Sequence, residues 1–214
     1  MSNTLERKFS AMINKRNSAA YPLEKAKFSF FFLLFFGCIL GAVIFIIGFD
    51  NSELYNSEPI TDHIQNIITA GSSRSALLIN AIKLSKTDLS HVLFIFISGF
   101  TYFCFFASGA IVFAKGFMLG FSLAFLIPIY DSVPLTAPVI YVVVYCITKL
   151  MSSVITVLLA AETYVFSYEF RIIKQNCSIL RRASVTYKFA FVFIKALGGC
   201  LLSNLLYCIS IKLL

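Results

Sequence analysis

The sequence predicts an all-α fold, a polytopic membrane helical bundle of about five transmembrane helices, with the N-terminus cytosolic and the C-terminus outside. Composition is the first reason, because 59% of the 214 residues are hydrophobic and only 13% are charged, whereas soluble domains carry about a quarter charged residues. The apolar residues also form blocks long enough to cross a bilayer. Finally, lysine and arginine gather in segments between these blocks, which is the pattern that sets membrane orientation.

The N-terminal region divides into a polar, basic tail, residues 1–27, and a first apolar block, residues 28–49. The block is too long for a cleavable signal peptide, whose apolar region has about 7–15 residues, and no small-residue cleavage site follows it. We therefore expect a retained transmembrane helix behind a cytosolic tail. The net charge of +8 then reflects topology, and no nucleic-acid partner is expected.

The charges of the two polar segments 50–88 and 171–188 set the orientation. Residues 50–88 mix acids with bases, whereas residues 171–188 carry bases and no acid, so we place the first segment outside and the second in the cytosol. Apolar residues recur at helical spacing in the outer loop, at Ile64, Ile67, Ile68, Leu77, Leu78 and Ile82. We expect two short amphipathic helices on the outer membrane face there, and a mobile loop is the alternative.

Residues 89–214 are expected to form a four-helix transmembrane core that includes the basic cytosolic loop 171–188. The expected helices are 89–114, 116–130, 134–161 and 189–211. The segment 116–130 is short, because a rise of about 1.5 Å per residue gives about 22 Å against an apolar core of about 30 Å. We favour a full crossing, and a re-entrant half-helix is the alternative.

Small residues recur at helix-packing spacing in three apolar blocks, at Gly37 and Gly41, at Gly116, Gly120 and Ala124, and at Ala196, Gly199 and Ser203. Small residues at this spacing let helix backbones approach closely in a membrane. The sequence therefore predicts a compact bundle, and it leaves open whether one of these faces forms a homo-oligomer.

Ionisable residues within the apolar blocks are costly and need partners or a function. We expect Lys115 to anchor a helix end at the cytosolic face, and Glu162 to pair with Lys195. Lys149 can share one helix face with three hydroxyl residues, Ser152, Ser153 and Thr156. This face predicts a polar seam against a neighbouring helix, and a water-lined path or a snorkelling lysine are the alternatives.

The sequence carries none of the motifs that identify common membrane enzymes. It has no HExxH, no GxSxG and no Walker glycine loop. We expect both histidines, His63 and His91, to be interfacial polar residues. The six cysteines lack CxxC spacing and are expected to be small buried hydrophobes. These features predict a protein that is not an enzyme, with no cofactor and no metal.

Residues 95–126, IFISGFTYFCFFASGAIVFAKGFMLGFSLAFL, resemble the signature region of the stage II sporulation protein M family. Its Lys-Gly-Phe-x-x-Gly-Phe segment is matched by Lys115, Gly116, Phe117, Gly120 and Phe121, and its earlier helix glycine is matched by Gly99. The chain departs from the family at Phe105-Phe106-Ala107, where Gly-Ile-Pro is frequent, and at Ala124, where a further glycine is frequent. It also has Val133-Pro134-Leu135-Thr136 in place of a Pro-x-Asn-like tract.

The resemblance implies a non-enzymatic scaffold in the bacterial cytoplasmic membrane. The named member of the family holds peptidoglycan-degrading proteins at the septum while the mother-cell membrane engulfs the forespore. The implied partners are therefore membrane lipid and membrane or surface proteins such as peptidoglycan hydrolases, in sporulation or envelope remodelling. The alternative is a membrane subunit of a transport system, whose separate ATPase would contact the basic loop 171–188 or a cytosolic helix near Lys115.

Overall fold

The computed structural model describes residues 2–48, 77–132, 137–176 and 179–213, with side chains described within 23–48, 81–124, 143–171 and 183–210. These ranges contain five helices and no strand. The helices are α1 (Ser2–Gly48), α4 (Leu77–Ser98), α5 (Cys104–Ser132), α6 (Ala137–Asn176) and α7 (Ile179–Leu213). The prediction of an all-helical bundle is confirmed.

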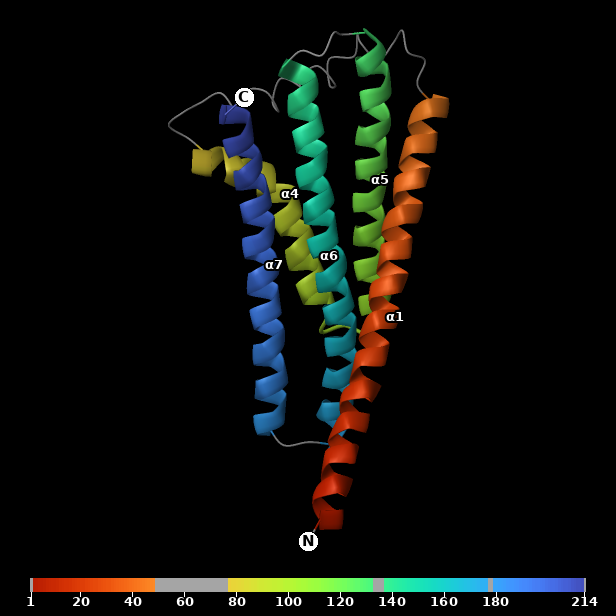
Figure 1. Cartoon of the computed structure of the whole chain (residues 1–214), viewed down its shortest axis with the longest axis vertical. Helices are drawn as coiled ribbons and strands as arrows, with labels where there is room; N and C mark the ends of the chain where they lie inside the picture. Colours follow the sequence, from red (N-terminus) through yellow and green to blue (C-terminus); the bar gives the residue numbers. More distant parts are fainter. Residues whose placement is uncertain (1, 49–76, 133–136, 177–178, 214) are drawn as a thin grey trace.

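The helices run alternately up and down, so the two ends of the chain lie at opposite ends of the bundle (Figure 1). Four stretches of the described residues are long and apolar enough to cross a membrane: Leu23–Gly48, Cys104–Ala124, Val143–Arg171 and Ala183–Ser210. The chain is therefore a multi-pass membrane protein. The helix α4 is not among these four stretches, and it differs from them because it carries Lys83, Lys86 and Asp88.

The boundary between the second and third passes differs from the expectation. We expected one helix over 89–114 and a new one after Lys115, but α4 ends at Ser98 and α5 runs without a break from Cys104 to Ser132. At about 1.5 Å per residue, the 29 residues of α5 span about 44 Å. The helix α5, of which the segment 116–130 is the second half, is therefore long enough for a full crossing.

The turn after α4 is fixed by its tertiary contacts. The amide of Gly99 donates to the carbonyls of Ile95 and Phe96, at 3.2 and 3.1 Å. A Cβ at Gly99 would lie 2.9 Å from Thr163 Cγ2 and 3.1 Å from Phe189 Cζ, so a larger residue would require side chains of α6 and α7 to shift. The chain turns at Gly99 because this is where its backbone meets two other helices.

The polar groups of the turn are satisfied by neighbours, as irregular backbone in a membrane protein requires. The Thr101 carbonyl accepts hydrogen bonds from Ser167 Oγ at 3.2 Å and from Arg171 Nη2 at 2.9 Å. The Arg171 guanidinium also lies 4.5 Å from the centre of the Tyr102 ring. Arg171 is the first residue of the segment 171–188 that the sequence predicts to be cytosolic, so the turn lies toward that end of the bundle.

Two expected loops are largely helical. The tail 1–27 belongs to α1 from Ser2 onward, and most of the expected loop 171–188 belongs to α6 and α7. In the outer segment, Ile64, Ile67 and Ile68 lie outside the described residues, whereas Leu77, Leu78 and Ile82 form the start of α4.

The helices α1 and α5 pack backbone to backbone through two pairs of glycines. A Cβ at Gly37 would collide with the carbonyl oxygen of Phe113, and one at Gly41 with that of Phe117. In the opposite direction, a Cβ at Gly116 would collide with the Leu34 carbonyl and one at Gly120 with the Cys38 carbonyl. Each helix thus receives the backbone of the other, as small-residue faces allow.

The other small residues also lie at contacts. Ala124 is buried beside Phe45, one turn beyond the glycine contact between α1 and α5. A Cβ at Gly199 would lie 3.0 Å from Ile155 Cδ1, so α6 and α7 approach closely there. The other two residues of this predicted small-residue face of α7, Ala196 and Ser203, are both buried.

Phenylalanine rings close the bundle beside the α4–α5 turn. The ring of Phe189 on α7 stacks on Phe166 of α6 at 4.0 Å and on Phe96 of α4 at 4.9 Å between centroids. Phe100, in the turn itself, meets Phe166 edge-on at 5.3 Å. Such ring pairs add about 0.5–1.5 kcal/mol each beyond area burial, so this cluster holds the turn against α6 and α7.

Candidate functional site

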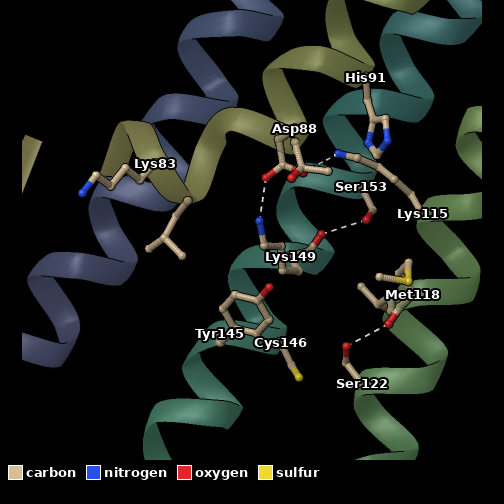
Figure 2. Close-up of a pocket in the computed structure, with 13 residues that line it drawn as sticks. Lys83, Asp88, His91, Lys115, Met118, Ser122, Tyr145, Cys146, Lys149 and Ser153 are labelled. Atoms are coloured by element: carbon tan, nitrogen blue, oxygen red, sulfur yellow. Dashed lines mark hydrogen bonds and ion pairs between the residues drawn. The ribbon is translucent and has the colours of Figure 1, made fainter. Parts of the chain in front are cut away.

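A buried carboxylate, Asp88 of α4, lies at the centre of the bundle and joins two lysines from different helices. Its Oδ1 lies 2.9 Å from Lys115 Nζ of α5, and its Oδ2 lies 2.7 Å from Lys149 Nζ of α6. Only 5% of the Asp88 side chain is exposed. Figure 2 shows the carboxylate between the two ammonium groups. One acidic side chain therefore ties α4, α5 and α6 together.

The Lys115 ammonium uses all three of its N–H donors. Besides the ion pair with Asp88, it donates to Ser152 Oγ at 2.9 Å and to Thr156 Oγ1 at 2.8 Å. Its side chain is 6% exposed. The expectation that Lys115 anchors a helix end is wrong, because α5 continues through it and the lysine points into the bundle.

A fourth helix, α7, joins the network through Asn204. The Asn204 amide Nδ2 donates to Asp88 Oδ2 at 3.2 Å and to the carbonyl of Cys200 at 2.9 Å. The Asn204 Oδ1 accepts from Lys149 at 3.5 Å. Lys149 also lies 5.4 Å from the centre of the Tyr145 ring. We call Asp88, Lys115, Lys149, Ser152, Thr156 and Asn204 the ion network.

The hydroxyl face of α6 has two roles. Ser152 and Thr156 accept from Lys115, and Thr156 also donates to the carbonyl of Ser152 at 2.8 Å. Ser153 donates to the carbonyl of Lys149 at 2.8 Å and lines a pocket. The face predicted from the spacing after Lys149 is thus a polar contact with α5, although the lysine that it holds is Lys115.

The charges of the ion network do not balance. Two ammonium groups meet one carboxylate, which leaves a net charge of +1 among these side chains. Buried charges are tolerated when they are paired and hydrogen-bonded, and removing one partner of such a pair is strongly destabilising. Asp88 therefore stabilises two positive charges at once.

A pocket of about 310 Å³ adjoins the ion network between α4, α5 and α6. Asp88, Lys115, Lys149 and His91 line its polar side, and the apolar lining includes Leu84, Met118, Leu119 and Tyr145. The pocket also meets the surface of the bundle, because Lys83, Thr87 and Met118 line it and are exposed. It is the feature of the described residues best suited to hold a ligand.

His91 lies in this pocket wall. Its Nδ1 atom is buried and has no hydrogen-bond partner among the described residues. Figure 2 shows its ring beside the Lys115 side chain. A buried polar atom without a partner is rare enough in a folded protein to need an explanation.

The expected ion pair of Glu162 with Lys195 does not form between these two described side chains, whereas Asp88 forms two ion pairs. Lys195 is exposed on α7, and its Nζ lies 4.4 Å from the centre of the Phe191 ring. Glu162 and Lys195 instead line a second pocket, of about 300 Å³, together with Lys27 of α1. The side chains share a depth in the bundle, as expected, without being in contact.

The sequence reasoning missed Asp88 and Asn204. Asp88 was assigned to the outer loop because it stands at the polar edge of an apolar block, and Asn204 is a single amide within one. The available signal was that Lys115 and Lys149 both stand in apolar blocks and need acidic partners, and that Asp88 stands at the edge of such a block.

The cysteines whose side chains are described, Cys38, Cys104, Cys146, Cys200 and Cys208, are free thiols. Among the described residues, no group of three His, Cys, Asp or Glu side chains is placed to hold a metal ion. Comparisons of the chain with protein-family models, with curated proteins and with solved structures found no match.

Proposed function

We propose that the chain is a non-enzymatic scaffold of the bacterial cytoplasmic membrane, similar in role to the stage II sporulation protein M family. It recruits or positions partner proteins such as peptidoglycan hydrolases during sporulation or envelope remodelling. The proposal rests on the resemblance of residues 95–126 and on the positions that the matched residues occupy in the bundle.

The observation that carries the proposal is that the matched residues lie at contacts between helices. Gly99 packs on Thr163 and Phe189 in the α4–α5 turn. Lys115 joins Asp88 to the hydroxyls of α6. Gly116 and Gly120 receive the backbone of α1. These positions support a role for the motif in building a rigid bundle.

Rigidity suits a scaffold, because a partner bound on one side must be held at a fixed place and orientation. The ion network connects α4, α5, α6 and α7, and the glycine contacts connect α5 to α1. All five described helices are thus linked by close contacts whose loss would be costly.

The test is affinity purification of the full chain from native membranes in mild detergent, followed by mass spectrometry of stoichiometric partners. In one variant, residues 52–74 are replaced by a glycine–serine linker of equal length, which leaves α4 whole. We expect a peptidoglycan hydrolase to be recovered with the wild type and lost with this variant.

A matched variant changes Lys174, Arg181 and Arg182 to glutamine, and it retains Arg171 because that side chain caps Thr101. We expect this variant to keep the hydrolase. Recovery of a cytosolic ATPase that this variant loses would replace the scaffold by a transport subunit. Recovery of no stoichiometric partner from sporulating or dividing cells would also contradict the proposal.

A further inference from the structure

The pocket beside the ion network has an uncompensated positive charge in its wall. Lys115 and Lys149 together carry two positive charges, and Asp88 carries the one negative charge that faces them. Glu162 lines the second pocket and not this one. In an interior of low dielectric an unbalanced charge is costly, and an anion in the pocket would balance it.

Lys149 has a donor to spare for such an anion. Its ammonium carries three N–H groups, of which one binds Asp88 at 2.7 Å and a second reaches Asn204 at the long distance of 3.5 Å. Its side chain is 21% exposed, against 6% for Lys115. Since Lys149 lines the pocket, the remaining N–H is available to a ligand there.

His91 provides a second polar group in the same wall. Its buried Nδ1 lacks a partner among the described residues. In the tautomer that carries a proton at this atom, His91 donates to a ligand anion and the unsatisfied atom is explained. Two other hydroxyls of the lining have partners within their own helices, because Ser122 donates to the Met118 carbonyl and Ser153 to the Lys149 carbonyl.

The rest of the lining is apolar, which limits the kind of anion that fits. Leu84, Leu119 and Met118 lie in the pocket wall, and the volume of about 310 Å³ falls at the lower end of the range for small-molecule sites. A ligand with one charged group and a short apolar part would satisfy both sides of the pocket. A bare ion would leave the apolar side empty.

The pocket extends from the ion network toward the C-terminal end of the bundle. The helix α5 runs toward that end and α4 and α6 run away from it (Figure 1). Ser122, Tyr145 and Lys83 of the lining therefore lie nearer that end than Lys115, Lys149 and Asp88 on the same helices. The Lys83 ammonium points away from the network (Figure 2), so it adds attraction at the mouth and no direct contact. A ligand therefore enters from the side opposite the basic segment.

We propose that this pocket binds an amphiphilic anion, whose carboxylate or phosphate group is held by Lys149 and His91 and whose apolar part lies against Leu84, Met118 and Leu119. The same chemistry is offered by a phospholipid headgroup and by a soluble amphiphile, and the experiment separates these sources. The proposal does not depend on the scaffold role, because it follows from the charges and lining of the pocket.

The experiment measures binding of octyl phosphate and octanoate to the full chain in phosphatidylcholine nanodiscs, with octanol as the neutral control. Affinity is obtained from the shift of thermal unfolding with ligand concentration. We expect both anions to raise the unfolding temperature and octanol not to raise it. Lys149→Met keeps the balanced Asp88–Lys115 pair, so this variant is expected to fold. It should bind octyl phosphate and octanoate at least about tenfold more weakly than the wild type, because it loses a charge-assisted hydrogen bond to the anion.

Lys195→Met is the matched control, since it removes one lysine charge from α7 at a distance from the pocket, and it should bind as the wild type does. If Lys149→Met does not fold, His91→Phe replaces it, because that change leaves both ion pairs intact. Octyl phosphate and octanoate that stabilise no more than octanol would overturn the proposal. Wild-type affinity in Lys149→Met, or in His91→Phe where that variant is used, would do the same.

The source of the ligand is read from native mass spectrometry of the chain extracted from its own membranes. An anionic phospholipid retained by the wild type and lost by Lys149→Met identifies a lipid headgroup as the ligand. Binding of octyl phosphate or octanoate without a retained lipid identifies a soluble amphiphile. Either result supports the site, and they differ only in the origin of the anion.

Discussion

Replacing Asp88 by asparagine tests whether the ion network is a main source of stability. The change keeps the size and most of the hydrogen-bonding capacity of the side chain, but it removes the charge that faces two ammonium groups at 2.9 and 2.7 Å. The net charge among these side chains would rise from +1 to +2. Because Asp88 is 5% exposed, water cannot replace the lost interaction at that position.

The magnitude follows from the burial of the two lysines. Removing one partner of a buried ion pair costs about 3–5 kcal/mol, and Lys115, at 6% exposure, should show this full effect. Lys149, at 21% exposure, borders the pocket and recovers part of its hydration there. We therefore expect Asp88→Asn to lower the free energy of unfolding by about 3–5 kcal/mol in total, and not by twice that amount.

The assay is unfolding by sodium dodecyl sulfate in mixed micelles, followed by far-ultraviolet circular dichroism because the chain has no tryptophan. Lys149→Met is the comparison, since it leaves one carboxylate with one ammonium and should cost about 2 kcal/mol. In the double variant Asp88→Asn/Lys115→Met the costs should be less than additive, because the second change removes the stranded charge. A loss below about 1 kcal/mol for Asp88→Asn, or a larger loss for Lys149→Met, would refute the reasoning.

Three further predictions test the packing and the topology. Gly120→Val should destabilise the bundle by about 3 kcal/mol, because its Cβ would collide with the backbone of α1; Gly198→Ala, which meets nothing within 4 Å, should change stability by less than about 1 kcal/mol. Phe189→Ala should lower the free energy of unfolding by about 3–5 kcal/mol in the same assay, whereas Phe28→Ala, at an exposed ring, should lower it much less. Equal losses for the two variants would contradict the packing of Phe189. Alkaline phosphatase fused after Asn176 should be inactive and fused to the C-terminus should be active; an active fusion at Asn176 would contradict the direction of the chain.

The helix boundaries show where local sequence information ends. The segment from the start of the second pass to the end of the third is almost continuously apolar, so hydropathy indicates two helices without indicating where the chain turns. Lys115 was the most polar residue in the middle of this segment and was therefore taken as the boundary. The chain turns instead at Gly99, where Thr163 and Phe189 pack closely against the backbone and where Ser167 and Arg171 bind the carbonyl of Thr101.

The candidate site was half visible in the sequence. The spacing of Ser152 and Thr156 on one face of α6 follows from the geometry of a helix, so a polar seam could be predicted. The partner of this seam, Lys115, could not be predicted, because its long side chain comes from another helix and from a distant position in the sequence. Lys115 is joined to a hydroxyl 41 positions away, and no local pattern records that contact.

The sequence by itself determined that this is a membrane protein, that it is all-helical, that successive helices run in opposite directions, and which helix faces carry small residues. These properties depend on composition and on periodicity along single helices, and both can be read without knowing any contact between helices. The tertiary structure decided that Asp88 and Lys115 lie inside the bundle, that they meet with Lys149, and that a pocket remains beside them. Those outcomes depend on which helices are neighbours and at what depth, because an isolated charge in the membrane is stabilised only by the side chains that other helices bring to it.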